Sequence, residues 1–149
     1  MNKVACLSFQ ERRVKAVKEL SRVLVVGGRA LIYVWALEQK KNQKPSTYLN
    51  QGKQNANTYD KPTETDAQNS STLAVHTNRT EFRQQDLLVP WHLKKKEVSD
   101  GCAKQVFHRF YHVFREGELE ELVQCIEGVV IEDLYYDEGN WCVVLQKQG

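Results

Sequence analysis

The residues best suited to chemistry are aromatic and basic side chains that gather in the second half of the sequence. Trp91 and His92 form one pair, and the stretch 106–115 is dense in both types. Arginine and histidine side chains can hold a carboxylate or a phosphate through charge-assisted hydrogen bonds, and an aromatic plane can stack on an unpaired base. The candidates for holding an anionic or planar ligand are Trp91, His92, Arg109, Tyr111, His112 and Arg115.

The local geometry decides whether these residues act together. On a helix Arg109 and His112 share one face, whereas an extended strand places them on opposite faces. Trp91 has an equal alternative as a plug at the edge of a sheet, and the basic residues also fit an ordinary amphipathic surface. The lysine run 94–96 attracts phosphate in a salt-dependent way or simply lies in a solvated loop.

Metal and disulfide chemistry have less support. His108 and His112 stand four residues apart, but no third ligand lies nearby in the sequence, so we expect no metal site. The cysteines are widely spread without a C-x-x-C pair, which is typical of free thiols in a reducing compartment. They are Cys6, Cys102, Cys125 and Cys142.

The first 40 residues predict one helix followed by one strand. Ser8 and Glu11 match a capping box, apolar residues follow at helical spacing, and Gly27-Gly28 ends the helix. The continuously apolar run 30–36 then predicts a strand buried on both faces, as in a parallel sheet. A helix, a glycine stop and a buried strand make one αβ step of a layered fold.

Two residues lie at the carboxyl end of this strand. Open α/β sheets place ligands at that end, so Trp35 and Glu38 are candidates for the edge of a pocket. Trp35 also fits a core position.

The region 41–83 has a different composition. Asn, Gln, Thr, Ser and Lys dominate without periodicity, and such a stretch buries too little apolar area to offset ~1–2 kcal/mol per residue of backbone ordering. We therefore predict a disordered polar insert. Order is expected to return at 86–93, where few apolar residues and Pro90 predict a packed loop rather than a regular element.

The tail predicts a helix and a hairpin. Apolar residues at helical spacing in 119–126 follow an acidic first turn, which suits the positive end of a helix dipole. Residues 129–136 and 141–145 then read as two strands around a turn. The fold class is α/β, divided into a partial domain over 1–40, the insert over 41–83, and the rest of the domain over 84–149.

Composition adds little to this picture. The chain has 149 residues, a net charge of +2 and 41% hydrophobic residues, ordinary values for a soluble protein. Its start has no apolar leader, and no run reaches the ~20 apolar residues of a spanning helix. We expect no membrane association and a cytoplasmic, possibly nuclear, location.

Four motifs in the same order resemble one family. The run Val23–Gln39 resembles the R-V-L-x-P-G-G … Y-V-W-A-x-E-Q segment of the tRNA wobble-uridine carboxymethyl methyltransferases, the tRNA methyltransferase 9 and AlkB homologue 8 family. Asp86–His92, Phe107–Leu119 and Asp137–Trp141 also resemble that family. The match covers about 95 residues on both sides of the insert.

The resemblance implies a fold and a reaction. The fold is the end of a class I, Rossmann-like methyltransferase domain, with the last parallel strands and a strand inserted antiparallel. The reaction transfers a methyl group from S-adenosylmethionine to a carboxymethyluridine carboxylate at the tRNA wobble position. A carboxylate is already a nucleophile, so alignment matters and no catalytic base is expected. The six candidates named above would contact the substrate or the anticodon loop.

The chain departs from the family in its front half. A D/E-x-G-x-G-x-G cofactor loop is absent, Val26 replaces the proline before the two glycines, and residues 1–7 do not resemble the family's fourth strand. The resemblance also implies a small zinc-binding activator, whose docking strand it places in the missing half. We therefore expect neither S-adenosylmethionine nor the activator to bind this chain.

Two functions are compatible with this pattern. One is membership of a tRNA methyltransferase whose cofactor half is missing here. The other is a catalytically silent truncated isoform, or a tRNA-binding or regulatory fragment. A strand and a hairpin would expose an open sheet edge, which predicts marginal stability or the need for a partner.

Overall fold

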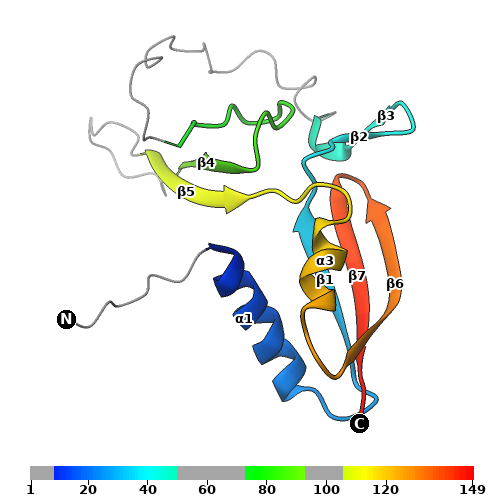
Figure 1. Cartoon of the computed structure of the whole chain (residues 1–149). Helices are drawn as coiled ribbons and strands as arrows, with labels where there is room; N and C mark the ends of the chain where they lie inside the picture. Colours follow the sequence, from blue (N-terminus) through cyan, green and yellow to red (C-terminus); the bar gives the residue numbers. More distant parts are fainter. Residues whose placement is uncertain (1–8, 50–72, 93–105) are drawn as a thin grey trace, which may run out of the picture.

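The computed structural model describes residues 9–49, 73–92 and 106–149 (Figure 1). The elements follow one another as α1 (Phe9–Val23), β1 (Arg29–Trp35), β2 (Lys40–Lys41), β3 (Lys44–Pro45), β4 (Asp86–His92), β5 (Val106–His112), α3 (Glu118–Gln124), β6 (Val129–Asp137) and β7 (Asn140–Lys147). None of the described helices is long and apolar enough to cross a membrane.

The main sheet has three strands in the order β1-β7-β6. The central strand β7 is antiparallel to both neighbours, so β1 and β6 run in the same direction. The predicted C-terminal hairpin is therefore confirmed, and its last strand is inserted between two strands that are parallel to each other. The fold is mixed α/β with antiparallel pairing.

The prediction that β1 is buried on both faces is wrong. Its residues alternate between half-buried and exposed, with Leu31 52% and Tyr33 49% exposed. Ile32 and Val34 point to the other face, where α1 and α3 contribute to one core, and the described helices cover that face alone. In Figure 1, α3 lies against the sheet and α1 lies beside it. A continuous apolar run does not tell a one-sided strand from a two-sided one.

Both helices lie where their patterns predict. Gly27, with a φ of 76°, follows α1, and its N–H donates to the Lys147 carbonyl at 2.8 Å. The Lys147 ammonium donates to the carbonyls of Arg22 and Leu24 at 3.3 and 2.7 Å, which places a cation at the negative end of the helix. Ser8 lies outside the described residues, so the capping box stays a prediction.

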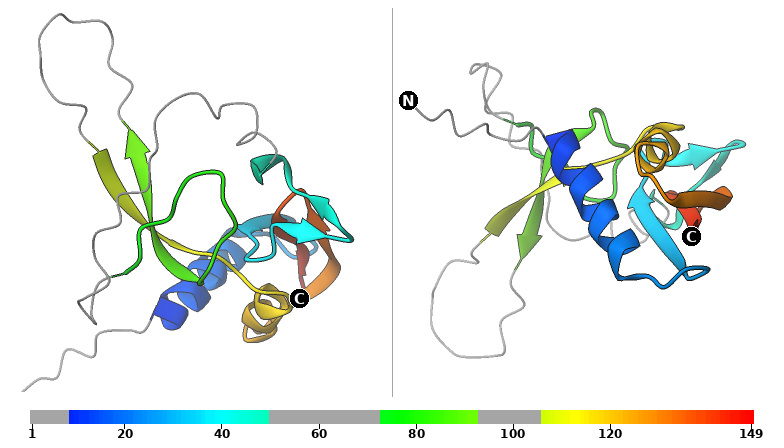
Figure 2. Two further views of the ribbon diagram at one scale, coloured as in Figure 1. Left: turned by 90° about the horizontal axis from the view of Figure 1, so that it is seen from above. Right: turned by 60° about the horizontal axis from the view of Figure 1, so that its bottom comes forward.

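The range 86–93 contains a strand instead of the predicted packed loop. β4 pairs with β5 in an antiparallel two-stranded ribbon, which projects away from the main sheet (Figure 2). Leu88 directs its N–H and C=O away from β5, toward Ala74 and His76. Since groups two residues apart on a strand point the same way, the Pro90 nitrogen also points away from β5. Proline therefore removes no bond from the ladder.

The two ends of the predicted insert are packed, contrary to the expectation of disorder from 41 to 83. β2 and β3 form a short hairpin, and Phe82 and His76 are only 7% and 8% exposed. Phe82 belongs to a second core with Leu87, Val89 and Val113, against which Trp35, Leu37, Tyr48 and Tyr111 pack. Residues 50–72 lie outside the described residues.

The turn between β6 and β7 depends on a glycine. Glu138 and Gly139 have φ values of 43° and 94°, as a two-residue type I′ turn requires. A Cβ on Gly139 would stand 2.6 Å from Gln39 Oε1, and Gln39 Nε2 donates to the Ala36 and Gly139 carbonyls at 2.7 and 2.9 Å. Gly139→Ala is expected to lower the free energy of unfolding by about 2–4 kcal/mol, because backbone strain and overpacking add.

The matched control for that prediction is Gly128→Ala. Gly128 has a φ of 74° but no atom within 4 Å of an added Cβ, so only the backbone strain of about 1–2 kcal/mol applies. Urea denaturation of both variants measures the difference. Equal losses would contradict the close contact between Gly139 and Gln39.

Candidate nucleic-acid interface

The register of the ribbon sorts its side chains onto two faces. Directly paired residues share a face, and the pairs alternate along the strands. The face that we call the platform face carries Leu87, Val89, Trp91, Phe107, Arg109 and Tyr111, and the opposite face carries Asp86, Leu88, Pro90, His108, Phe110 and His112. The extended alternative is thus the one observed, and Arg109 and His112 lie on opposite faces.

The outer end of the platform face presents two aromatic rings and one cation. Trp91 and Phe107 are 39% and 41% exposed, with ring centroids 5.8 Å apart. The Arg109 guanidinium carbon lies 4.4 Å from the centre of the Trp91 ring, within the range of a cation–π contact. Exposed aromatic planes beside a guanidinium are the combination that stacks bases and attracts phosphates.

The inner end of the platform face is anchored in the second core. Leu87 and Val89 are buried, and Tyr111 stacks on Trp35 with ring centroids 5.1 Å apart. Trp91 therefore lies in the ribbon rather than at an edge of the three-stranded sheet. The core fixes one end of the platform, and the other end remains accessible.

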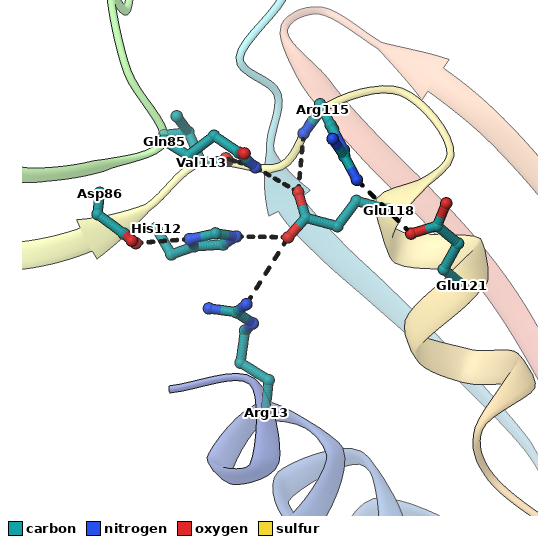
Figure 3. A network of polar contacts seen from close by, with 8 residues as sticks. All are labelled: Arg13, Gln85, Asp86, His112, Val113, Arg115, Glu118 and Glu121. Atoms are coloured by element: carbon teal, nitrogen blue, oxygen red, sulfur yellow. Dashed lines mark hydrogen bonds and ion pairs between the residues drawn. The ribbon is translucent and has the colours of Figure 1, made fainter. Parts of the chain in front are cut away.

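His112 joins the ribbon to both helices (Figure 3). Its Nδ1 lies 2.7 Å from Asp86 Oδ1 and its Nε2 lies 2.7 Å from Glu118 Oε1. Arg13 of α1 approaches the same Glu118 carboxylate at 3.7 Å, and Gln85 hydrogen-bonds its other oxygen. Both ring nitrogens of His112 are thus within hydrogen-bond distance of a carboxylate.

The six residues predicted to contact the substrate do not form one site. Two carboxylates occupy both nitrogens of His112, so it is poorly placed to hold another anion. Arg115 is exposed beyond the ribbon, 3.9 Å from Glu121. The structure brings Trp91, Arg109 and Tyr111 together on one face, whereas the side chain of His92 lies outside the described atoms.

Of the two residues predicted to line a pocket, Trp35 does so and Glu38 does not. Trp35 lines a pocket of about 200 Å³ at the carboxyl end of β1. Glu38 instead accepts hydrogen bonds from the Trp141 indole at 3.2 Å and the Glu116 backbone N–H at 3.4 Å. It thus braces the turns around the sheet.

Sequence reasoning missed several residues near these sites. Phe107 on the platform face was detectable, because period-two alternation puts it with Arg109 and Tyr111. Tyr48, Arg79 and Phe82 line the pocket beside Trp35, and they lie in the range taken for a disordered insert. Nothing local marks these three, since only tertiary contact brings them to β1.

The described residues also bear on the predictions for metal ligands and cysteines. Among the described residues, no group of three His, Cys, Asp or Glu side chains could hold a metal ion. His108 and His112 share a face but stand four strand residues apart, roughly 13 Å. Cys125 and Cys142 are free, the first exposed and the second buried, while the other two cysteines lie outside the described residues.

A pH-dependent contact holds the second core together. Burial lowers the pKa of His76 below its ordinary value and so favours the neutral ring in the folded chain. Its Nε2 lies 2.9 Å from the Tyr48 hydroxyl, which can donate to it. In the unfolded chain the imidazole binds a proton near pH ~6.5. His76 therefore stabilises the fold above that pH, and this contribution is lost as the pH falls below it.

The corresponding prediction compares two chains across that range. From about pH 7.5 to about pH 5 the wild type is expected to lose more stability than His76→Gln, whose side chain does not titrate. Urea midpoints of both chains at each pH provide the measurement, and the shared carboxylates cancel in the comparison. Parallel losses would show that His76 is not held neutral.

No protein-family model matches the chain, but individual proteins do. It is 45% identical over 163 aligned residues to the tRNA (carboxymethyluridine(34)-5-O)-methyltransferase alkbh8 of Xenopus tropicalis, covering 96% of this chain and 26% of that protein. The mouse protein of the same name is 40% identical over 92% of this chain and 28% of its own length. The tRNA (carboxymethyluridine(34)-5-O)-methyltransferase of Schizosaccharomyces pombe is 32% identical over 94% of this chain and 51% of its own length.

The chain thus spans between about a quarter and a half of the length of these relatives. Similarity over nearly the whole of this chain, in proteins from frog, mouse and fission yeast, confirms the resemblance seen in the four motifs. The chain belongs to the tRNA (carboxymethyluridine(34)-5-O)-methyltransferase family and corresponds to one segment of its longer members.

Proposed function

We propose that the chain supplies the tRNA-contacting part of an S-adenosylmethionine-dependent methyltransferase that acts on carboxymethyluridine at the wobble position. The observation that carries this proposal is the 45% identity over 96% of the chain to a protein named for that reaction. The topology supports a Rossmann-like origin, because β7 is inserted antiparallel between two strands that run the same way.

The outer edge of β1 supports the view that further strands come from outside this chain. Gly28 and Ala36 bond toward β7, whereas the Trp35 carbonyl accepts from Phe114 on the other side. By alternation, the backbone groups of Leu31 and Tyr33 point to that other side, where no described strand pairs with them. An unpaired edge of this kind is a template for another strand.

The described residues do not fit S-adenosylmethionine. Gly27 and Gly28 are the one adjacent glycine pair in the sequence, and they lie before β1, at its amino end. Ligands in open α/β sheets bind at the carboxyl ends of the strands, against a glycine-rich turn and a helix N-terminus. We therefore place the methyl-donor site in a part of the enzyme outside this chain.

The platform face supports the RNA side of the proposal. Stacking on Trp91 and Phe107 suits an unpaired anticodon base, and Arg109 suits the neighbouring phosphate. Methylation of a carboxylate needs alignment rather than a base. The task of this segment is then to hold the wobble nucleotide, and no proton transfer is required of it.

A second candidate is a catalytically silent tRNA-binding or regulatory fragment. The lack of fit between the described residues and S-adenosylmethionine favours it, and it would use the same platform face. The two candidates differ in whether this segment supports catalysis once a donor site is present. For either one we propose a cytoplasmic or nuclear location and expect no docking of the zinc-binding activator on this segment alone.

The deciding experiment is a segment exchange. The matching segment of the Schizosaccharomyces pombe relative is replaced by this chain, and methyl transfer to tRNA that carries carboxymethyluridine is measured. We expect the chimera to transfer methyl groups, and a Trp91→Ala chimera to be impaired. A chimera that folds and binds S-adenosylmethionine but transfers nothing would favour the silent fragment.

A further inference from the structure

The pocket at the carboxyl end of β1 is built from β1, the hairpin turn between β6 and β7, and the described ends of the polar insert. Three aromatic side chains form its walls, Trp35 from β1 and Tyr48 and Phe82 from the insert. Its volume of about 200 Å³ is below the ~300–1,000 Å³ of pockets for drug-sized ligands, so it suits a single ring with a short substituent.

The aromatic walls are held in place by contacts on their far sides. The Tyr48 hydroxyl accepts from the Arg79 backbone N–H at 2.8 Å and lies 2.9 Å from His76 Nε2, so both of its roles are filled. Phe82 stacks on Tyr48 with an interplanar angle of 9°. Burial raises the pKa of Tyr48, which keeps the hydroxyl neutral. These rings are preorganised rather than adaptable.

The polar lining contains a group that can pair with a negative charge on a ligand. The Arg79 guanidinium carbon lies 5.3 Å from the centre of the Tyr48 ring, and Arg79 is the cation in the described lining. Glu138 also lines the pocket, but Lys44 Nζ at 3.3 Å and the Thr47 N–H at 3.2 Å already bind its carboxylate. A guanidinium pairs well with a carboxylate.

The pocket and the platform face share one contact, between Trp35 and Tyr111. Trp35 lines the pocket and also stacks on Tyr111, at the inner end of that face. Tyr111 and Arg109 are same-face neighbours, about 7 Å apart along the strand. Trp91 and the pocket therefore lie at opposite ends of one row of side chains.

We propose that this pocket binds the modified wobble base, a uracil ring that carries a carboxylate, with Arg79 as the residue that selects the carboxylate. The proposal rests on the tRNA function proposed above and adds the site and the selecting residue. Trp35, Tyr48 and Phe82 contact the ring, and Thr47 and Asn140 offer a hydroxyl and an amide to its polar edge.

The test uses the full chain and two nucleosides. Uridine and 5-carboxymethyluridine are titrated while the backbone amide shifts of Arg79, Gly139 and Asn140 are followed by NMR. We expect the carboxymethyl form to shift these amides and to bind about tenfold tighter than uridine, the least that a charge-assisted contact contributes. Arg79→Gln is expected to abolish the preference.

Lys40→Gln is the matched control, because it removes an equal charge from a neighbouring exposed pair with Glu81 that does not line the pocket. Its preference should equal that of the wild type. Absence of shifts at the three amides, or an unchanged preference in Arg79→Gln, would overturn the inference. An anticodon stem-loop titrated in parallel separates the two proposals: stem-loop binding without nucleoside shifts at the pocket refutes the pocket alone, and nucleoside shifts without stem-loop binding refute the tRNA function.

Discussion

Trp91→Ala is expected to weaken binding of an anticodon stem-loop by about 5- to 150-fold. Stacking of a base on an aromatic side chain contributes ~1–3 kcal/mol, and Trp91 presents an exposed ring over which Arg109 lies at 4.4 Å. Its loss also removes the surface that positions the guanidinium. Fluorescence anisotropy with a labelled stem-loop at fixed salt measures the effect, because salt alone changes such affinities strongly.

Phe110→Ala is the matched control for this effect. Phe110 is also 39% exposed and lies in the same ribbon, but on the opposite face. If the platform face binds RNA, Phe110→Ala should change the affinity by less than about twofold. Equal losses of affinity in the two variants would mean that the ribbon contributes nonspecific binding or stability rather than a specific RNA-binding face.

His112→Ala is expected to lower the free energy of unfolding by about 1–3 kcal/mol. The substitution removes the ring that Asp86 Oδ1 and Glu118 Oε1 share, while Glu118 Oε2 keeps its bond from Gln85, and the Glu118 side chain is only 16% exposed. Loss of the hydrogen-bond partner of a largely buried oxygen costs about that amount. The edge contact of His112 with Phe114, at a centroid distance of 4.9 Å, is lost as well. Urea denaturation provides the measurement.

Arg22→Ala supplies the comparison for His112. Arg22 forms an ion pair with Glu19 at 2.8 Å, but both side chains are about two-thirds exposed. Pairs of this kind contribute about 0–1 kcal/mol. If His112→Ala costs no more than Arg22→Ala, the carboxylate–histidine network does not join the ribbon to the helices, and His112 becomes available again as a ligand for substrate.

The elements with regular patterns were predictable from the sequence. Short-range periodicity predicts α1 and α3, which has an acidic first turn. Turn residues predict the glycine stop after α1 and the C-terminal hairpin. The strand at 86–92 was not, because Pro90 suggests a break. Only the pairing direction of Leu88, fixed by contact with Ala74 and His76, shows that the proline nitrogen faces away from the ladder.

The candidate site was predictable only where residue type and local alternation determine it. Trp91, Arg109 and Tyr111 were identified by residue type, and the strand places them on one face. His112 has the same chemistry, but two carboxylates distant in sequence determine its role. Tyr48 and Phe82 were missed, since a polar stretch can still bury isolated aromatic residues when a partner such as Trp35 lies elsewhere in the chain.

A calorimetric titration of the purified chain with an anticodon stem-loop that carries carboxymethyluridine, followed by S-adenosylmethionine, tests most directly whether this segment binds tRNA without the methyl donor. We predict that the chain binds the RNA and gives no binding heat with S-adenosylmethionine, because the platform face is present and the described residues include no fitting donor site. Micromolar binding of S-adenosylmethionine by this chain, or no binding of the RNA, would contradict this prediction.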